Sequence, residues 1–136
     1  MKAFVDTNIF IRLLTGDDHA KEQRCLDLFR QARGGTVTLV TTSTIVAEVT
    51  FVLTSRTTYQ FARADVALGM QTLLALQGLR LDQKTEVIAA LNLWEASTLD
   101  FPDCLAAEIT RQMSLDGIYS YDRGFDRIPG IRRLEP

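Results

Sequence analysis

The sequence predicts a three-layer α/β/α domain in which a mostly parallel central sheet lies between layers of helices. Short runs rich in β-branched residues alternate with longer amphipathic segments, which is typical of parallel sheets covered by helices. No proline-rich bridge, repeat or change of composition divides the 136 residues. We therefore expect a single domain spanning residues 1–136, long enough to enclose a real core.

The first part of the chain alternates strands and helices. Residues 3–5 resemble a short buried strand, and the Asp-Thr-Asn sequence at 6–8 can cap the helix that follows. Glycines at 16, 34–35 and 78 end three of the expected helices. The expected elements are a strand at 3–5, helices at 9–14 and 20–32, a strand at 36–40, helices at 45–54 and 61–76, and a strand at 79–81.

The last part of the chain predicts two more helices and two strands. A helix at 84–99 carries an apolar stripe formed by Val87, Ile88, Leu91 and Trp94. The next helix opens at 100–103, where proline is tolerated in a first turn. The final strands are expected at 118–121 and 131–134.

Composition excludes several classes of protein. With 46% hydrophobic and 24% charged residues, the chain does not resemble a disordered tail, and no apolar run is long enough to cross a bilayer. The N-terminus lacks the apolar stretch and cleavage site of a signal peptide, so we expect a cytoplasmic protein without a membrane partner. The net charge of −2 argues against simple electrostatic wrapping of nucleic acid.

The scarcity of histidine and cysteine excludes several catalytic mechanisms and kinds of metal site. His19 is the single histidine, which excludes two-histidine nuclease mechanisms and histidine-rich metal sites. Cys25 and Cys104 lie among apolar neighbours and are expected to be small buried hydrophobes. The residues that remain for catalysis are carboxylates.

Four carboxylates occupy informative positions. Asp6 and Asp122 each follow a predicted strand, and parallel strands place such ends at one edge of a sheet, where open α/β sheets bind ligands. Asp103 lies in the first turn of a helix. Glu48 falls on the apolar stripe of its helix, where a carboxylate needs a cation or a proton.

Each acid also has a structural explanation. Asp6 could cap the following helix, Asp103 could interact with the helix dipole, and Asp122 could be a turn residue. Glu48 could pair with an arginine. Taken together, however, clustered carboxylates favour a hard divalent cation, which offsets their mutual repulsion. The natural reaction of such a site is phosphodiester hydrolysis with one or two metal ions.

Four segments resemble the PIN-domain ribonucleases, and in particular the VapC-type toxins of toxin–antitoxin pairs. These segments occur in the family's order and spacing, and the resemblance spans essentially the whole chain. They are residues 4–9 (Phe-Val-Asp-Thr-Asn-Ile), Ser43 with Glu48, residues 100–107 around Asp103, and residues 120–125 around Asp122.

The resemblance implies a Mg²⁺- or Mn²⁺-dependent endoribonuclease whose metal-site acids are Asp6, Glu48, Asp103 and Asp122. Asp6 and Asp103 would be the most direct ligands, and the other two acids would complete the site directly or through water. Thr7 and Ser120 match the small hydroxyl residues that line such sites.

The resemblance also implies partners, and the sequence departs from the family pattern at one point. Family members usually form dimers and are held inactive by an antitoxin whose C-terminal segment enters the acidic groove. Their RNA substrates differ. The position where the family often has a further acid is Gly124, and the next acid, Asp126, either reaches the metal or pairs with Arg123 or Arg127.

Arginines follow the fourth acid. They are Arg123, Arg127, Arg132 and Arg133. They either hold RNA phosphates beside the metal or are ordinary solvated surface residues. Two other functions stay open: a nuclease of RNA maturation or DNA flaps, and a PIN-like module that has lost catalysis and binds RNA or protein.

Overall fold

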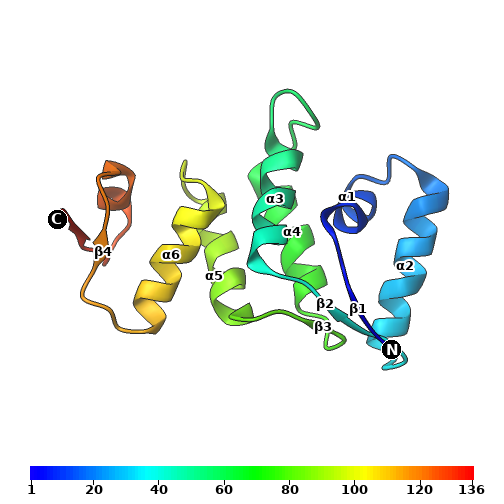
Figure 1. Ribbon diagram of the computed structural model, residues 1–136. Helices are drawn as coiled ribbons and strands as arrows, with labels where there is room; N and C mark the ends of the chain where they lie inside the picture. The colour runs from blue at the N-terminus through cyan, green and yellow to red at the C-terminus, as the bar shows by residue number, and fades with distance from the viewer. The chain divides into compact units, whose positions relative to one another are not determined.

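The computed structural model describes residues 1–136 (Figure 1). The chain divides into two compact units, Met1–Lys84 and Thr85–Pro136. The first unit contains β1 (Lys2–Phe4), α1 (Thr7–Thr15), α2 (His19–Arg33), β2 (Thr38–Val40), α3 (Ser43–Thr54), α4 (Arg63–Leu74) and β3 (Leu79–Arg80). Helix α5 (Lys84–Glu95) begins at the boundary, and α6 (Phe101–Gln112), β4 (Ile118–Tyr119), the 3₁₀ helix η1 (Arg123–Arg127) and β5 (Arg133–Leu134) complete the second unit.

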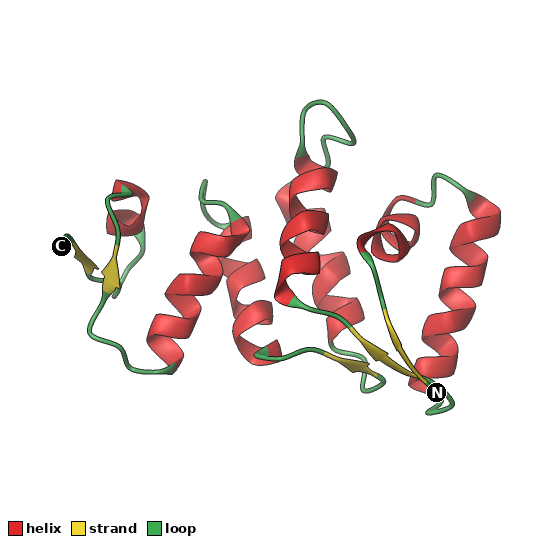
Figure 2. Cartoon of the chain, viewed as in Figure 1, coloured by secondary structure: helices red, strands yellow, loops and turns green.

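Every strand pair is parallel, as the alternation of strands and helices predicted. The first unit has a three-stranded sheet of order β1-β2-β3, in which Leu39 pairs with Ala3 on one side and Leu79 on the other. The second unit has the pair β4-β5, in which Ile118 is opposite Arg133. These strands are the yellow arrows of Figure 2. All five strands are two or three residues long.

Helix ends follow the capping chemistry of the sequence. Gly16 ends α1 in the left-handed conformation, with φ 61°, and donates its N–H to the Arg12 carbonyl. Asp18 caps α2 by accepting the Lys21 N–H, and Thr42 caps α3 by accepting the Ile45 N–H. Each cap joins residues only three positions apart in the sequence. They fix where the helices start relative to the strands that precede them.

The core of the first unit forms between the sheet and its helices. Phe10 of α1 is fully buried and makes an edge-to-face contact with Phe29 of α2, with ring centroids 6.0 Å apart. Leu39 of the central strand is also fully buried. Gly78 allows β3 to approach α2, because a Cβ there would lie 2.1 Å from the Ala32 carbonyl oxygen. This packing fixes β1 and thereby the start of α1.

The second unit has a smaller core under η1. Ala107, Phe125 and Ile128 are buried together, and Leu99 and Ile118 pack against them. The cluster holds η1 against α6 and β4. It therefore positions Asp122, which directly precedes η1, and Asp103, which lies on α6.

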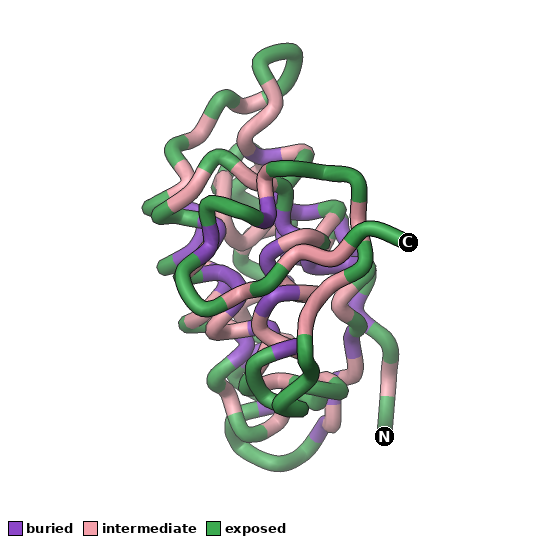
Figure 3. The backbone as a smooth tube through the Cα atoms, turned by 90° about the vertical axis from the view of Figure 1, so that its left-hand side faces the viewer, coloured by how far each residue is buried: buried purple, intermediate pink, exposed green.

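Several expectations about individual elements were wrong. Phe4 is 57% exposed although residues 3–5 were expected to be buried, because β1 is an edge strand and successive side chains of a strand alternate in direction. Figure 3 shows how little of the chain near the N-terminus is buried. Helix α5 ends at Glu95 and not at 99, since the Ser97 hydroxyl accepts the Leu99 N–H and stabilises a turn instead.

The expectation that both cysteines are buried is confirmed. Cys25 and Cys104 are both buried thiols that form no disulfide. None of the helices combines the length and the apolar character needed to cross a membrane.

Candidate functional site

Asp6 is the residue that joins β1 to α1. Val5 is buried and donates its N–H to the Val40 carbonyl, which holds the end of β1 against β2. Asp6 is exposed and occupies the N-cap position of α1, yet its side chain makes no capping hydrogen bond. Helix capping therefore does not occupy this carboxylate, which is left available for another partner.

Thr7 and Glu48 link α1 to α3. The buried Thr7 hydroxyl donates a 2.6 Å hydrogen bond to Glu48 Oε2. Glu48 itself is exposed, so the expectation that it faces the core was wrong, and no arginine pairs with it. The buried face of α3 is formed instead by neighbours such as Val46 and Val49. Thr7 fixes one oxygen of this exposed carboxylate and leaves the other without a hydrogen bond from Thr7.

Asp103 and Asp122 form a second pair of carboxylates, both in the Thr85–Pro136 unit. Asp103 lies in the first turn of α6 and is half-buried, whereas Asp122 is exposed. Burial raises the pKa of Asp103, and the negative charges of Asp122 and Asp100 raise it further. No lysine or arginine forms an ion pair with either Asp103 or Asp122. The pair is thus a local excess of negative charge without a protein cation.

Asp100 belongs to this group although the sequence analysis did not single it out. It is the N-cap residue of α6 and makes no side-chain capping bond, like Asp6 at the start of α1. Its charge acts on Asp103. The signal was present in the sequence as two aspartates three residues apart at a helix start, where one turn brings them to the same side.

A compact turn holds Asp122. The Asp122 N–H donates to Ser120 Oγ at 2.9 Å, and Asp122 Oδ1 accepts the Gly124 N–H at 2.8 Å. The turn role that the sequence offered as an alternative is therefore real, but it uses only one carboxylate oxygen. Ser120 supports the turn with its hydroxyl.

Asp126 and Arg133 form an ion pair of 3.0 Å, so the pairing of Asp126 with Arg123 or Arg127 was not found. Arg133 also bonds Glu135 and the Ser120 carbonyl, and its side chain is only 13% exposed. It is therefore not a free surface arginine ready for RNA. Arg123, Arg127 and Arg132, in contrast, are exposed and form no ion pair.

The four predicted acids fall in two pairs, one in each unit. Asp6 and Glu48 belong to Met1–Lys84, and Asp103 and Asp122 belong to Thr85–Pro136. Within neither unit do three or more His, Cys, Asp or Glu side chains gather closely enough to hold a metal ion. The meeting of all four acids at one site thus stays a prediction.

The donor chemistry nevertheless fits a hard divalent cation. All four side chains supply carboxylate oxygens, which Mg²⁺ and Mn²⁺ prefer. Ordinary ligand carboxylates are themselves held by hydrogen bonds, and Glu48 and Asp122 each have one oxygen held in this way.

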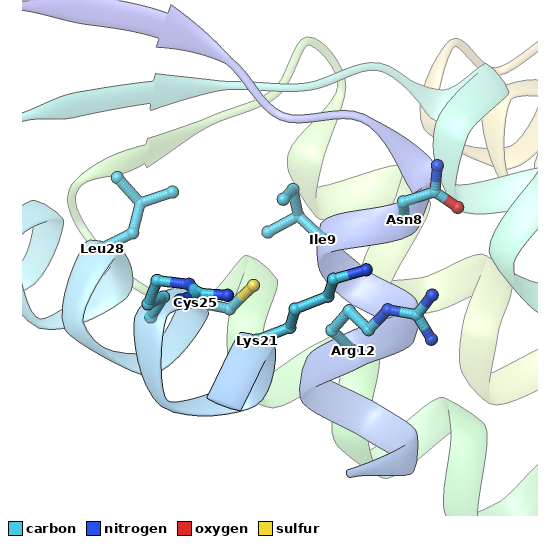
Figure 4. A pocket seen from close by; sticks show the side chains of 7 residues that line it. Asn8, Ile9, Arg12, Lys21, Cys25 and Leu28 are labelled. Atoms are coloured by element: carbon cyan, nitrogen blue, oxygen red, sulfur yellow. The ribbon is translucent and has the colours of Figure 1, made fainter. Parts of the chain in front are cut away.

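A groove of about 540 Å³ lies between α1 and α2 in the first unit. Figure 4 shows the side chains of Arg12 and Lys21 at this groove, with Ile9, Cys25 and Leu28 on its apolar side. Arg24 adds another cation. The groove contains none of the predicted acids, so it is a feature separate from the candidate site.

The fold and site together define an α/β protein of parallel strands that carries carboxylates at a strand end and at helix starts. The sequence model of the PIN domain family matches residues 3–131 of this chain. The chain belongs to the PIN domain family, whose members are typically nucleases, and the predicted fold class is thereby confirmed.

No curated protein sequence matches the chain. A crystal structure of VapBC2 from Rickettsia felis, bound to a DNA fragment from its promoter, matches with a TM-score of 0.38 and 17% identity, covering 99% of this chain and 98% of that one.

Proposed function

We propose that the protein is a Mg²⁺- or Mn²⁺-dependent endoribonuclease that acts as the toxin of a toxin–antitoxin pair. The observation that carries the proposal is the Asp103–Asp122 pair, in which two carboxylates interact without any protein cation. A divalent ion would offset this repulsion. Membership in a family of nucleases supports the same chemistry.

The site would be completed by both pairs of acids in one domain. Asp6 and Asp103 would be the most direct ligands, and Glu48 and Asp122 would bind the ion directly or through water. When bound, the ion would supply the Lewis-acid chemistry of phosphodiester hydrolysis, activating water and stabilising the leaving oxygen. No histidine is required for this reaction.

The surrounding residues would orient the acids and the RNA. Thr7 holds one oxygen of Glu48, and the Gly124 N–H holds one oxygen of Asp122 in the turn that Ser120 supports, so both carboxylates have a restricted range of orientations. Arg123 and Arg127 carry unpaired charges beside Asp122 in the sequence, where they would bind phosphates of RNA.

The direct test is RNA cleavage by the purified protein. The wild-type protein should cut RNA only with Mg²⁺ or Mn²⁺, and a chelator should stop the reaction. Asp6→Asn and Asp103→Asn should each abolish cleavage while leaving the circular dichroism spectrum unchanged. Asp27→Asn, which removes an exposed acid paired with Arg30 on α2, should cut normally. Cleavage by Asp103→Asn at the normal rate would contradict the proposal.

The toxin role needs a test in cells. Induced expression should arrest growth for the wild-type chain but not for Asp103→Asn, and a small protein encoded beside the gene should relieve the arrest. Sequencing of the cut RNAs would identify the substrate. A homodimer and a cytoplasmic location are further parts of the proposal. RNA binding without metal-dependent turnover would favour a module that has lost catalysis.

A further inference from the structure

Arg133 occupies an unusual position for a surface arginine of this chain. It lies on β5, and its side chain is 13% exposed. Its guanidinium donates to Asp126 Oδ1 at 3.0 Å, to Glu135 Oε1 at 2.5 Å and to the Ser120 carbonyl at 3.0 Å. Five N–H donors in a planar fork allow one arginine to bind several acceptors at once.

The bond to Ser120 connects Arg133 to the candidate site. Ser120 donates its own N–H to the Leu134 carbonyl, so β5 holds this residue through both its N–H and its carbonyl. Ser120 Oγ then accepts the Asp122 N–H. A continuous series of hydrogen bonds therefore runs from Arg133 through Ser120 to Asp122.

Asp122 lies close enough to Asp103 for its charge to act on that carboxyl, and its own turn is held by hydrogen bonds to Ser120 and Gly124. The distance between two carboxylates decides whether one divalent ion can bind both. Gly124, whose N–H binds Asp122 Oδ1, closes the same turn. A turn that loosened would let the two carboxylates move apart, since like charges repel.

We propose that Arg133 is a positioning residue that holds the Ser120–Asp122 turn in place for divalent-ion binding by Asp122 and Asp103. The inference rests on the proposed function for its metal, but the hydrogen bonds of the turn do not depend on that function. Arg133 also keeps Asp126 in an ion pair, so this acid has a partner other than the metal. Arg133 thus supports the turn that contains Asp122 and forms an ion pair with Asp126.

The test compares Arg133→Met with Arg111→Met. Arg111 is the control because it too bonds a carboxylate, that of Glu108, and a backbone carbonyl, that of Pro129, whereas Arg133 bonds two carboxylates and the Ser120 carbonyl. Hydrogen exchange measured without metal reports directly on the turn. In Arg133→Met the amides of Asp122 and Gly124 should exchange faster, whereas Arg111→Met should leave them protected.

Divalent-ion affinity gives the second readout. Binding of Mn²⁺, followed by electron paramagnetic resonance, should weaken by about tenfold in Arg133→Met, as expected for a residue that supports a ligand. kcat for RNA cleavage should fall while KM changes little. Arg133→Lys should restore only part of the affinity, because a lysine ammonium lacks the separate nitrogens with which the guanidinium reaches its partners. Glu135→Gln leaves the Ser120 bond intact and should retain full affinity.

The outcomes separate the two proposals. Absence of Mn²⁺ binding or RNA cleavage in the wild-type protein would overturn the proposed function. Unchanged exchange of Asp122 and Gly124 in Arg133→Met would overturn the positioning role of Arg133, whatever the wild-type protein does. Equal losses of Mn²⁺ affinity in Arg133→Met and Arg111→Met would do the same, because they would point to general destabilisation.

Discussion

Thr7 Oγ1 donates a hydrogen bond of 2.6 Å to Glu48 Oε2, which joins the first turn of α1 to the middle of α3 across 41 positions of sequence. Asp6 precedes Thr7 directly, so the bond connects the neighbourhoods of two predicted metal ligands. Packing of α1 on α3 brings the hydroxyl and the carboxylate together. This hydrogen bond couples the packing of α1 on α3 to the orientation of the Glu48 carboxylate.

Replacing Thr7 by valine tests that coupling. Valine has a similar shape but no hydroxyl, so Glu48 should lose its restricted orientation, and kcat for RNA cleavage should fall about tenfold. The free energy of unfolding should fall by about 1 kcal/mol, as for one lost hydrogen bond. Cleavage rates and urea unfolding measure the two effects.

Thr50→Val is the control for this substitution. Thr50 is also buried, but its hydroxyl bonds the Ala47 carbonyl within α3 and does not touch an acid. Thr50→Val should lower the free energy of unfolding and leave kcat unchanged. Thr7→Ser keeps the hydroxyl and should leave both quantities unchanged. Equal losses of kcat in Thr7→Val and Thr50→Val would show that Thr7 acts on stability alone.

Asp103→Asn should stabilise the metal-free protein slightly and weaken its binding of a divalent ion. A raised carboxyl pKa means that the ionised form is disfavoured in the folded protein, so removing the charge should raise Tm slightly at pH 7 without metal. Cleavage should be abolished, a fall of about 100-fold or more, because Asp103 would help to hold the divalent ion that stabilises transition-state charge.

Thermal unfolding with and without Mg²⁺ measures this prediction. The ion should raise Tm of the wild-type protein, because it binds only the folded state, and leave Asp103→Asn unchanged. Asp27→Asn should respond to Mg²⁺ like the wild-type protein. A variant at Asp103 that gains as much stability from Mg²⁺ as the wild type would exclude Asp103 as a ligand.

Asp17 predicts a pH dependence of folding in the first unit. Hydrogen bonds from Tyr59 and Arg12 lower the pKa of this carboxyl from 3.8 to about 2. Because the folded-state pKa lies below the unfolded value, the stabilisation is complete above pH 3.8 and is lost as the pH falls towards 2. Tyr59→Phe should therefore reduce the decline of the urea midpoint between pH 5 and pH 2.5.

The matched control for Tyr59 is Tyr119→Phe in the second unit, where the tyrosine side chain is 71% exposed. It should show the acid decline of the wild-type protein. Asp18 lies next to Asp17 and also acts on Arg12, so the double variant Tyr59→Phe/Asp18→Asn identifies any shared contribution. An undiminished acid decline in Tyr59→Phe would exclude its hydroxyl as the main cause.

Arg123 and Arg127 predict a salt dependence of RNA binding. If each contacts one phosphate, replacing it with glutamine should reduce the slope of log affinity against log salt by about 0.7 to 0.9. Filter binding with the inactive Asp103→Asn protein avoids cleavage during the measurement. Arg30→Gln, whose arginine pairs with Asp27 on α2, should leave the slope unchanged. The RNA-binding assignment fails if the double Arg123→Gln/Arg127→Gln variant keeps the wild-type slope.

The fold was predictable from the sequence where local chemistry decides it. Asp18 and Thr42 start helices because their side chains accept hydrogen bonds from the first turn, and this signal is contained within four residues. The direction of Glu48 was not predictable. Helix α3 is apolar on nearly every side, and even Phe51 is 72% exposed, so hydrophobic spacing does not identify its buried face.

The partners of the site acids depend on distant parts of the chain. Arg133 looked like one of several arginines available to RNA, but its bond to Ser120 spans 13 positions and follows from the pairing of β4 with β5. Spacing in the sequence does not encode such contacts. The types and order of the site acids could be predicted from the sequence, whereas their hydrogen-bond partners could be identified only in the structure.

The two buried thiols give each unit a built-in chemical reporter. Cys25 lies in the first unit and Cys104 in the second, and neither forms a disulfide. A thiol reagent reacts with a buried cysteine only when its surroundings open. Labelling rates at these two positions would therefore show, without any engineered probe, whether the halves of the chain open together or one before the other.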